Sequence, residues 1–163
     1  MISILGVPTK IIVADFTKPD VLPMIISRLD EFKIDIGVLV NNVGLLGEHQ
    51  MPFLELNRNT VVNMINVNIT SGTVLCHHLL PQMKQKGKGA IINISSTASL
   101  IYIPYLAEYS ATKHFMTAFT IALAAEYSEY GVTIQCIEPG QVATEMTKYF
   151  ERVYISITPK DCF

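Results

Sequence analysis

The sequence predicts an α/β domain with a parallel sheet, and three observations support this fold class. Half of the 163 residues are hydrophobic and only 16% are charged, which is typical of parallel strands that are covered on both faces. Short apolar runs alternate along the chain with longer segments of helical periodicity. No stretch approaches the ~18 uninterrupted apolar residues that a membrane-spanning helix requires. We therefore expect a single domain over residues 1–163, in which helical crossovers connect the strands.

The first elements are predicted from their local patterns. The run KIIVA at 10–14 is rich in β-branched residues and stops at Asp15, so it predicts a buried strand. Apolar residues recur at helical spacing over 19–32, and Pro19 suits a helix start because its missing N–H costs nothing there. The aliphatic run IGVLV at 36–40 predicts the second strand.

A long helical pattern covers residues 56–86, and Gly87 suits its end because glycine readily adopts the left-handed conformation. We expect its inner face to be lined by Val61, Val62, Ile65, Ile69, Val74 and Leu75. The remaining elements continue the alternation: a strand at 90–94, a helix at 108–130 that ends before Gly131, a strand at 132–137 and a short helix at 144–150.

Polar and glycine residues follow the expected strands. Right-handed crossovers place the carboxyl ends of parallel strands at one edge of the sheet, where ligands of such folds bind. The segments expected at this edge are Asp15, 41–44, 95–96 and 139–140.

Composition excludes several other classes of protein. A net charge of −2 and a pI of about 6.1 provide no basic surface for nucleic acid. Cys76, Cys136 and Cys162 are odd in number and include no CxxC pair, which argues against disulfides and against zinc. We expect reduced cysteines, no metal site and no signal peptide.

Tyr109 and Lys113 carry the strongest chemical signal. They lie four residues apart in YSATK and share a helix face. An ammonium at ~4 Å attracts a phenolate by about 4 kcal/mol at an effective dielectric of ~20, which allows a fall of up to ~3 units in the phenol pKa. The alternative is an amphipathic helix that carries both residues by chance. Ser96 ends the preceding strand and could share one carbonyl oxygen with Tyr109. We choose it over Ser95, which points to the opposite strand face, and over Ser99.

Further motifs accompany the Tyr109 and Lys113 pair: NNVG at 41–44, Asn68, ISS at 94–96, YSATK at 109–113 and PGQVAT at 139–144. Through these motifs the chain resembles the short-chain dehydrogenase/reductase family over about residues 10–150. Segments such as ADFTK and EYSEYGVTIQ are similar to the branch with 17β-hydroxysteroid dehydrogenases types 3 and 12 and very-long-chain 3-oxoacyl-CoA reductases. The resemblance implies a partial Rossmann-type, doubly wound parallel sheet with family strands three to six.

The resemblance also implies an activity, the NAD(P)-dependent reduction of a carbonyl on a 3-ketoacyl-CoA or a 17-ketosteroid, in lipid metabolism or steroid biosynthesis. Tyr109 would be the general acid, and Lys113 would lower its pKa and bind the nicotinamide ribose. Ser96 would polarise the substrate carbonyl, and Asn68 would hold a water that resupplies the proton. Further cofactor contacts would come from Asp15, Asn42, Gly44, Val142 and Thr144.

Plain structural roles compete with these implied ones. Asp15 could cap the helix that follows it, and Asn42 and Gly44 could be turn residues. Asn is a weak helix former, so the position of Asn68 within a helix favours the functional role.

The chain departs from the family pattern at both ends. No glycine cluster of the family's TGxxxGxG type precedes Asp15, and the family's first two strands and its C-terminal part have no counterpart. We therefore expect a piece of a larger reductase. Strand 10–14 would then lack a neighbour, and strand 36–40 would have an exposed edge.

The branch favours NADP(H) over NAD(H) and places the longer parent in the endoplasmic reticulum, although this chain shows no targeting signal. The helix at 108–130 resembles a dimerising helix of the family, so a homodimer is expected there. The alternative function is a truncated, non-catalytic product that cannot bind cofactor and acts at most as an interaction module.

Overall fold

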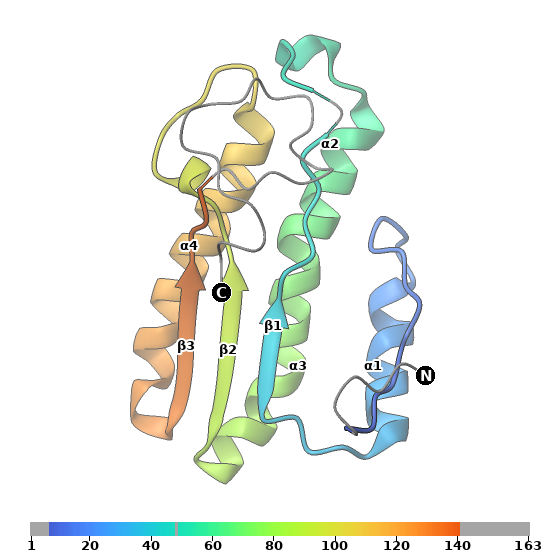
Figure 1. The fold of residues 1–163 in the computed structure, drawn as a ribbon, viewed down its shortest axis with the longest axis vertical. Coiled ribbons are helices and arrows are strands. Elements are labelled where there is room, and N and C mark those ends of the chain that lie inside the picture. Colours follow the sequence, from blue (N-terminus) through green and yellow to red (C-terminus); the bar gives the residue numbers. More distant parts are fainter. Residues whose placement is uncertain (1–6, 48, 141–163) are drawn as a thin grey trace.

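A parallel sheet organises residues 7–47 and 49–140, the part of the chain that the computed structural model describes (Figure 1). Its strands are β1 (Val38–Asn41), β2 (Gly89–Ile94) and β3 (Val132–Ile137), in the order β1-β2-β3. The α-helices are α1 (Val21–Phe32), α2 (Arg58–Ile65), α3 (Ser71–Lys86) and α4 (Ala107–Tyr127). The shorter helical segments are η1 (Phe53–Glu55), η2 (Asn66–Thr70), η3 (Thr97–Ser99) and η4 (Ser128–Tyr130). The expected α/β class is confirmed, and the helix expected at 144–150 lies outside the described residues.

The register brings the three strand ends to one edge of the sheet. Asn41 at the end of β1 lies beside Asn93, and Ile94 at the end of β2 lies beside Ile137. Figure 1 shows all three arrows pointing the same way, with the loops after β1 and β2 at the arrowhead end. The sheet edge at which we expected residues 41–44, 95–96 and 139–140 is therefore formed, whereas Asp15 follows no strand of the described residues.

Helices α3 and α4 cover one face of the sheet (Figure 1). Side chains alternate between the two faces of a strand, and Ile91 of β2 and Ile134 of β3 are buried on the covered face. A buried aliphatic side chain of this size contributes about 1.5–3 kcal/mol. The main core cluster comprises Cys76, Leu79, Leu80, Met83, Ile91, Val132 and Ile134.

The opposite face of the sheet is open in the described part of the chain. Val38 and Val40 of β1 are 57% and 53% exposed, and Ile137 of β3 is also exposed. Helix α1 packs against α3 and lies beyond the β1 edge in Figure 1. The expectation that these strands are covered on both faces is therefore not met by the described residues.

The strand expected at 10–14 is wrong. This segment has no strand structure, and Ile11 and Val13 are 78% and 90% exposed. Lys10 Nζ lies 4.0 Å from the centre of the Phe32 ring, so the segment runs along α1. A strand needs a hydrogen-bonded neighbour, and within residues 7–47 and 49–140 none pairs with this segment.

The helix expected at 56–86 consists of α2, η2 and α3 in succession. The middle segment, η2, is a π-helical turn, which inserts an extra residue into the helical ring. A constant 3.6-residue period therefore does not continue across it. Val62 and Ile65 of the expected inner face are exposed instead. The buried residues on this run include Met64, Val67, Cys76, Leu79, Leu80 and Met83.

Buried amide groups connect the strand ends to the helices. Asn41 Nδ2 donates to Asn93 Oδ1 at 2.8 Å, and Asn93 Nδ2 donates to Thr120 Oγ1 at 2.9 Å. Asn41 Nδ2 also lies 3.4 Å from Cys76 Sγ. Burial raises the pKa of the Cys76 thiol to about 11 despite these amides, so the thiol stays protonated at neutral pH.

Asn93 is fully buried, and its side chain accepts from Asn41 and donates to Thr120. Its removal should therefore lower the stability of the fold. We expect Asn93→Ala to lower the free energy of unfolding by about 2 kcal/mol, because the partly buried Asn41 amide and the buried Thr120 hydroxyl both lose a partner. Urea unfolding followed by circular dichroism measures this loss. Thr133→Ala on the exposed side of β3 is the matched control, and an equal loss in both variants would contradict the prediction.

Candidate active site

Helix α4 presents Tyr109 and Lys113 on one face of its first turns. Lys113 is 5% exposed, and its Nζ donates to the carbonyl oxygen of Ile94 at 3.0 Å. The same Nζ lies 5.8 Å from the centre of the Tyr109 ring. The ammonium is therefore held between the end of β2 and the phenol, as the four-residue spacing predicts.

Ser95 and Ser96, which follow β2, have different hydrogen-bond partners. The Ser96 Oγ accepts from the amide of Ala98 at 3.1 Å, and the Ser96 side chain is near enough to the phenol to lower the pKa of Tyr109 in part. The buried Ser95 Oγ donates instead to the carbonyl oxygen of Lys113 at 2.8 Å. Ser96 thus lies beside the phenol, and Ser95 fastens the strand to α4.

The two titrating groups are shifted chiefly by burial. Burial raises the pKa of Tyr109, and the Ser96 side chain lowers it in part. Burial also lowers the pKa of Lys113. The expected depression of the Tyr109 pKa is therefore wrong for this structure, because the Lys113 ammonium bonds the Ile94 carbonyl rather than the phenol oxygen. The phenol is consequently a proton donor at neutral pH.

Asn68 lies in the π-helical turn and is 5% exposed. Its Oδ1 accepts from the Leu45 amide at 2.7 Å, and its Nδ2 donates to the Leu45 carbonyl at 2.8 Å and to Thr112 Oγ1 at 2.9 Å. It therefore ties the loop after β1 to the residue next to Lys113. Thr112 and Leu45 were not predicted at the site, since no local sequence pattern marks either as a partner of Asn68.

The residues expected to contact the adenosine of a cofactor come earlier in the sequence than Ser96, Tyr109 and Lys113. Asp15 Oδ1 accepts from the Thr17 hydroxyl at 2.7 Å and from the Thr17 amide at 3.0 Å, and these bonds lower the pKa of its carboxyl. The N-cap of α1 is Asp20, so the alternative of Asp15 as helix cap is wrong.

Asn42 and Gly44 lie in the loop after β1, where Asn42 is exposed and Gly44 is partly buried. This loop is at the carboxyl edge of the sheet, as expected. Val142 and Thr144 lie outside the described residues.

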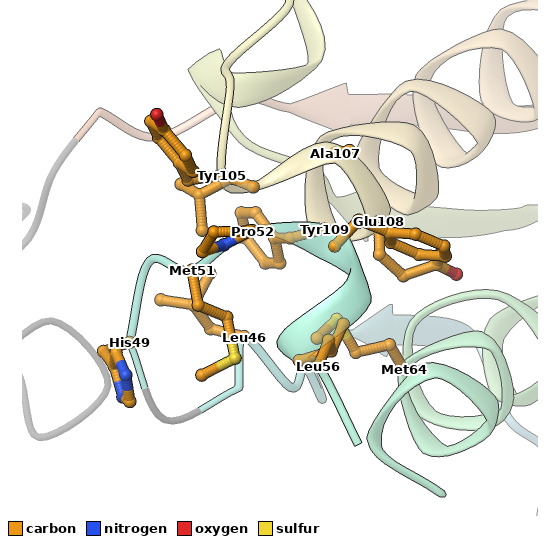
Figure 2. Close-up of a pocket in the computed structure, with 12 residues that line it drawn as sticks. Leu46, His49, Met51, Pro52, Leu56, Met64, Tyr105, Ala107, Glu108 and Tyr109 are labelled. Carbon is orange, nitrogen blue, oxygen red and sulfur yellow. The ribbon is translucent and has the colours of Figure 1, made fainter. Parts of the chain in front are cut away.

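A small cavity of about 220 Å³ opens beside Tyr109 (Figure 2). Its walls come from the loop after β1, from η1 and α2, and from the start of α4. Figure 2 shows Tyr109 and Met64 on one side of it and His49 on the other. Hydrocarbon side chains predominate, so the cavity suits an apolar group. The lining residues include Leu46, Met51, Pro52, Phe53, Leu56, Met64, Leu106 and Tyr109.

Within residues 7–47 and 49–140, no group of three or more His, Cys, Asp or Glu residues is arranged to hold a metal ion. None of the helices described here combines the length and the apolarity that a membrane crossing demands.

The raised pKa of Tyr109 can be tested by titration. The protein has seven tyrosines. We expect one of their phenols to ionise with a pKa above the ordinary value of about 10, and this component should disappear in Tyr109→Phe. Absorbance of phenolate near 295 nm measures it, and Tyr102→Phe, which removes an exposed phenol, is the control. Because the folded pKa is raised, stability should fall relative to Tyr109→Phe as pH rises above about 10. An unchanged late component in Tyr109→Phe would refute this.

The chain matches known proteins along most of its length. A family model described as short chain dehydrogenase matches residues 3–154. The very-long-chain 3-oxoacyl-CoA reductase-A of Danio rerio is 40% identical over 156 residues, covering 94% of this chain and 48% of that protein. The 17-beta-hydroxysteroid dehydrogenase type 3 of the same species is 36% identical over 160 residues, covering 96% of this chain and 51% of that protein.

A solved structure extends the likeness to the fold. The short-chain dehydrogenase from Sphingobium yanoikuyae, in complex with NADPH, matches with a TM-score of 0.74 and 32% identity, over 82% of this chain and 51% of that one. This chain spans about half the length of the curated relatives it matches. A family model covers residues 3–154, and Ser96 after β2 lies beside Tyr109 and Lys113 of α4 at the carboxyl edge of a parallel sheet; the chain belongs to the short chain dehydrogenase family.

Proposed function

We propose that this chain carries the catalytic site of an NADP(H)-dependent reductase that converts a carbonyl of a lipid-like substrate into a hydroxyl. The observation that carries the proposal is the partly buried Tyr109 phenol, whose ring centre lies 5.8 Å from the Nζ of the buried Lys113 and whose pKa the Ser96 side chain lowers in part. An apolar cavity opens at the same place. A proton donor, a polarising hydroxyl and an apolar pocket are what such a reduction requires.

The chemistry divides among these residues as follows. The cofactor, when bound, supplies the hydride that reaches the carbonyl carbon. Tyr109 gives its proton to the carbonyl oxygen, while Ser96 donates a hydrogen bond to the same oxygen. The Lys113 ammonium stabilises the phenolate that remains. A water held by Asn68 returns a proton to Tyr109. Both Nδ2 hydrogens of Asn68 already have protein partners, so Asn68 would hold this water by accepting a hydrogen bond from it.

The donor set at Lys113 fits the ribose of a nicotinamide cofactor. Its hydrogen bond to Ile94 uses one of three N–H donors, which leaves two for ribose hydroxyls. Asp15, Asn42 and Gly44 are proposed contacts on the adenosine side. Val142 and Thr144 are proposed contacts to the carboxamide. The choice of NADP(H) is supported by the NADPH complex of the Sphingobium relative.

The substrate class follows from the cavity and from the relatives. The hydrocarbon lining beside Tyr109 suits a fatty acyl or steroid group. The names of the two curated relatives refer to a 3-oxoacyl-CoA and to a 17β-hydroxysteroid, and we propose one of these classes here. For the longer protein we propose the endoplasmic reticulum, and a homodimer through α4, where Phe115 and Ile121 are exposed.

A second candidate is a non-catalytic product without cofactor binding. Two observations favour it: the open sheet face with exposed Val38 and Val40, and the segment at 10–14, which pairs with no strand of the described residues. A surface of this kind presents apolar side chains and strand hydrogen-bonding groups to other chains.

Cofactor binding separates the two candidates. NADPH is titrated into the protein while nicotinamide fluorescence is followed, with NADH in a parallel series. The reductase proposal expects saturable binding and a preference for NADPH. No binding at millimolar NADPH would reject catalysis by this chain and leave the interaction module.

The role of Tyr109 has its own test in the form of the protein that binds NADPH. We expect Tyr109→Phe to lower kcat by about 10²- to 10⁴-fold, the usual contribution of a general acid, with little change in NADPH affinity. Turnover of a 3-oxoacyl thioester and of a 17-ketosteroid is measured by NADPH absorbance. Tyr102→Phe, at an exposed site, should keep full activity. Undiminished turnover in Tyr109→Phe would exclude this role.

A further inference from the structure

We propose that Glu138 is a positioning residue, which sets the distance between the Ser96 hydroxyl and the catalytic face of α4. This inference rests on the proposed function of Ser96, Tyr109 and Lys113. Glu138 directly follows β3, and its side chain is partly buried. It contacts one hydroxyl on each of the two elements that carry the site.

Three successive residues at the end of β3, 137–139, hydrogen-bond with the segment 95–99 that follows β2. The Ile137 carbonyl accepts from the Ser95 amide at 2.8 Å, and the Pro139 carbonyl accepts from the Thr97 amide at 3.0 Å. Between them, Glu138 Oε1 accepts from the Ser99 hydroxyl at 2.8 Å. The side chain of Glu138 thus adds a third contact to two backbone bonds that flank it.

The same carboxylate oxygen reaches α4. Glu138 Oε1 accepts from Thr117 Oγ1 at 2.7 Å. Tyr109, Lys113 and Thr117 follow one another at intervals of four residues and therefore lie along one helix face. Glu138 consequently fixes the third position of the face whose first two positions carry the proposed chemistry.

The Ser99 and Thr117 hydroxyls each have a second acceptor within reach besides the Glu138 carboxylate. Ser99 Oγ lies 2.7 Å from the Ser96 carbonyl as well as near Glu138. Thr117 Oγ1 likewise lies 2.9 Å from Ser95 Oγ. Each hydroxyl has one proton to donate, and a charged acceptor forms the stronger bond. Both protons therefore point to Glu138, and loss of its charge lets both hydroxyls turn away.

The expected consequence is a loss of alignment rather than a loss of cofactor binding. Glu138 touches neither Tyr109 nor Lys113 in the contacts described above. It acts on Ser96 through Ser99 and the turn at 96–99. A displacement of about 1 Å at a reacting group can lower a rate by roughly 100-fold, so this turn needs a rigid support.

Amide hydrogen exchange in the intact chain tests the support directly and needs no activity. The amides of residues 97–100 are all hydrogen-bonded, to Pro139, Ser96 and Thr97. We expect Glu138→Gln to speed their exchange by about 10-fold or more, with residues 89–94 of β2 unchanged. Glu129→Gln makes the same chemical change at an exposed site and should leave both segments unchanged. Unaltered exchange at 97–100, or a uniform rise over the chain, would overturn the proposal.

Kinetics give the second readout. In the NADPH-binding form, Glu138→Gln should lower kcat by about 10- to 100-fold with KM for NADPH unchanged, and Glu138→Asp should recover part of the loss because it keeps the charge. Adding Ser99→Ala to Glu138→Gln should cost less than Ser99→Ala alone. A kcat equal to that of Glu129→Gln would overturn the proposal. A wild-type protein that binds NADPH without turnover contradicts the proposed function instead, and hydrogen exchange still decides the role of Glu138.

Discussion

Two hydrogen bonds of opposite direction join the end of β2 to α4, and the arrangement of the site depends on them. Lys113 Nζ donates to the Ile94 carbonyl, and the next residue along the strand, Ser95, donates its hydroxyl to the Lys113 carbonyl. The pair fixes how far α4 is inserted at the carboxyl edge of the sheet and how it is rotated about its axis. Because Tyr109 lies one turn before Lys113 and Ser96 lies one residue after Ser95, these two bonds position the backbone from which both hydroxyls extend, and the contacts of Glu138 add support to the turn at 96–99.

The electrostatics of the site follow from this burial. An ammonium that bonds a neutral carbonyl gains less than one paired with a carboxylate, and the pKa of Lys113 is accordingly lowered. The pKa of Tyr109 is raised by the same apolar surroundings. A phenol that keeps its proton is suited to donate it to a carbonyl oxygen, and a phenolate produced by that transfer is the species that a nearby ammonium stabilises. The proposed reduction requires a phenol that begins protonated, and the raised pKa of Tyr109 is consistent with that requirement.

The sequence predicted those parts of the molecule that local patterns describe. The aliphatic runs at β1, β2 and β3 and the helices between them were found within about two residues, since each buries apolar side chains at its own period. The segment at 10–14 has the composition of a strand, but a strand also needs a neighbour, which composition does not report. The predicted burial of Val62 and Ile65 was wrong, because the π-helical turn interrupts the 3.6-residue period on which the prediction relied. The contacts of Ser95, Thr112 and Glu138 were not predicted, because their partners lie 18 to 44 residues away in the chain, where no local pattern records the pairing.

Transfer of hydrogen from cofactor to substrate is the most direct test of the central claim that this site reduces a carbonyl. NADPH that carries deuterium at C4 of the nicotinamide is incubated with the protein and a 3-oxoacyl thioester or a 17-ketosteroid, and the product is examined by mass spectrometry. The account predicts a hydroxyl product with one deuterium on the former carbonyl carbon, in an amount that falls sharply in Tyr109→Phe. Unlabelled product, or labelled product formed equally by Tyr109→Phe, would contradict it.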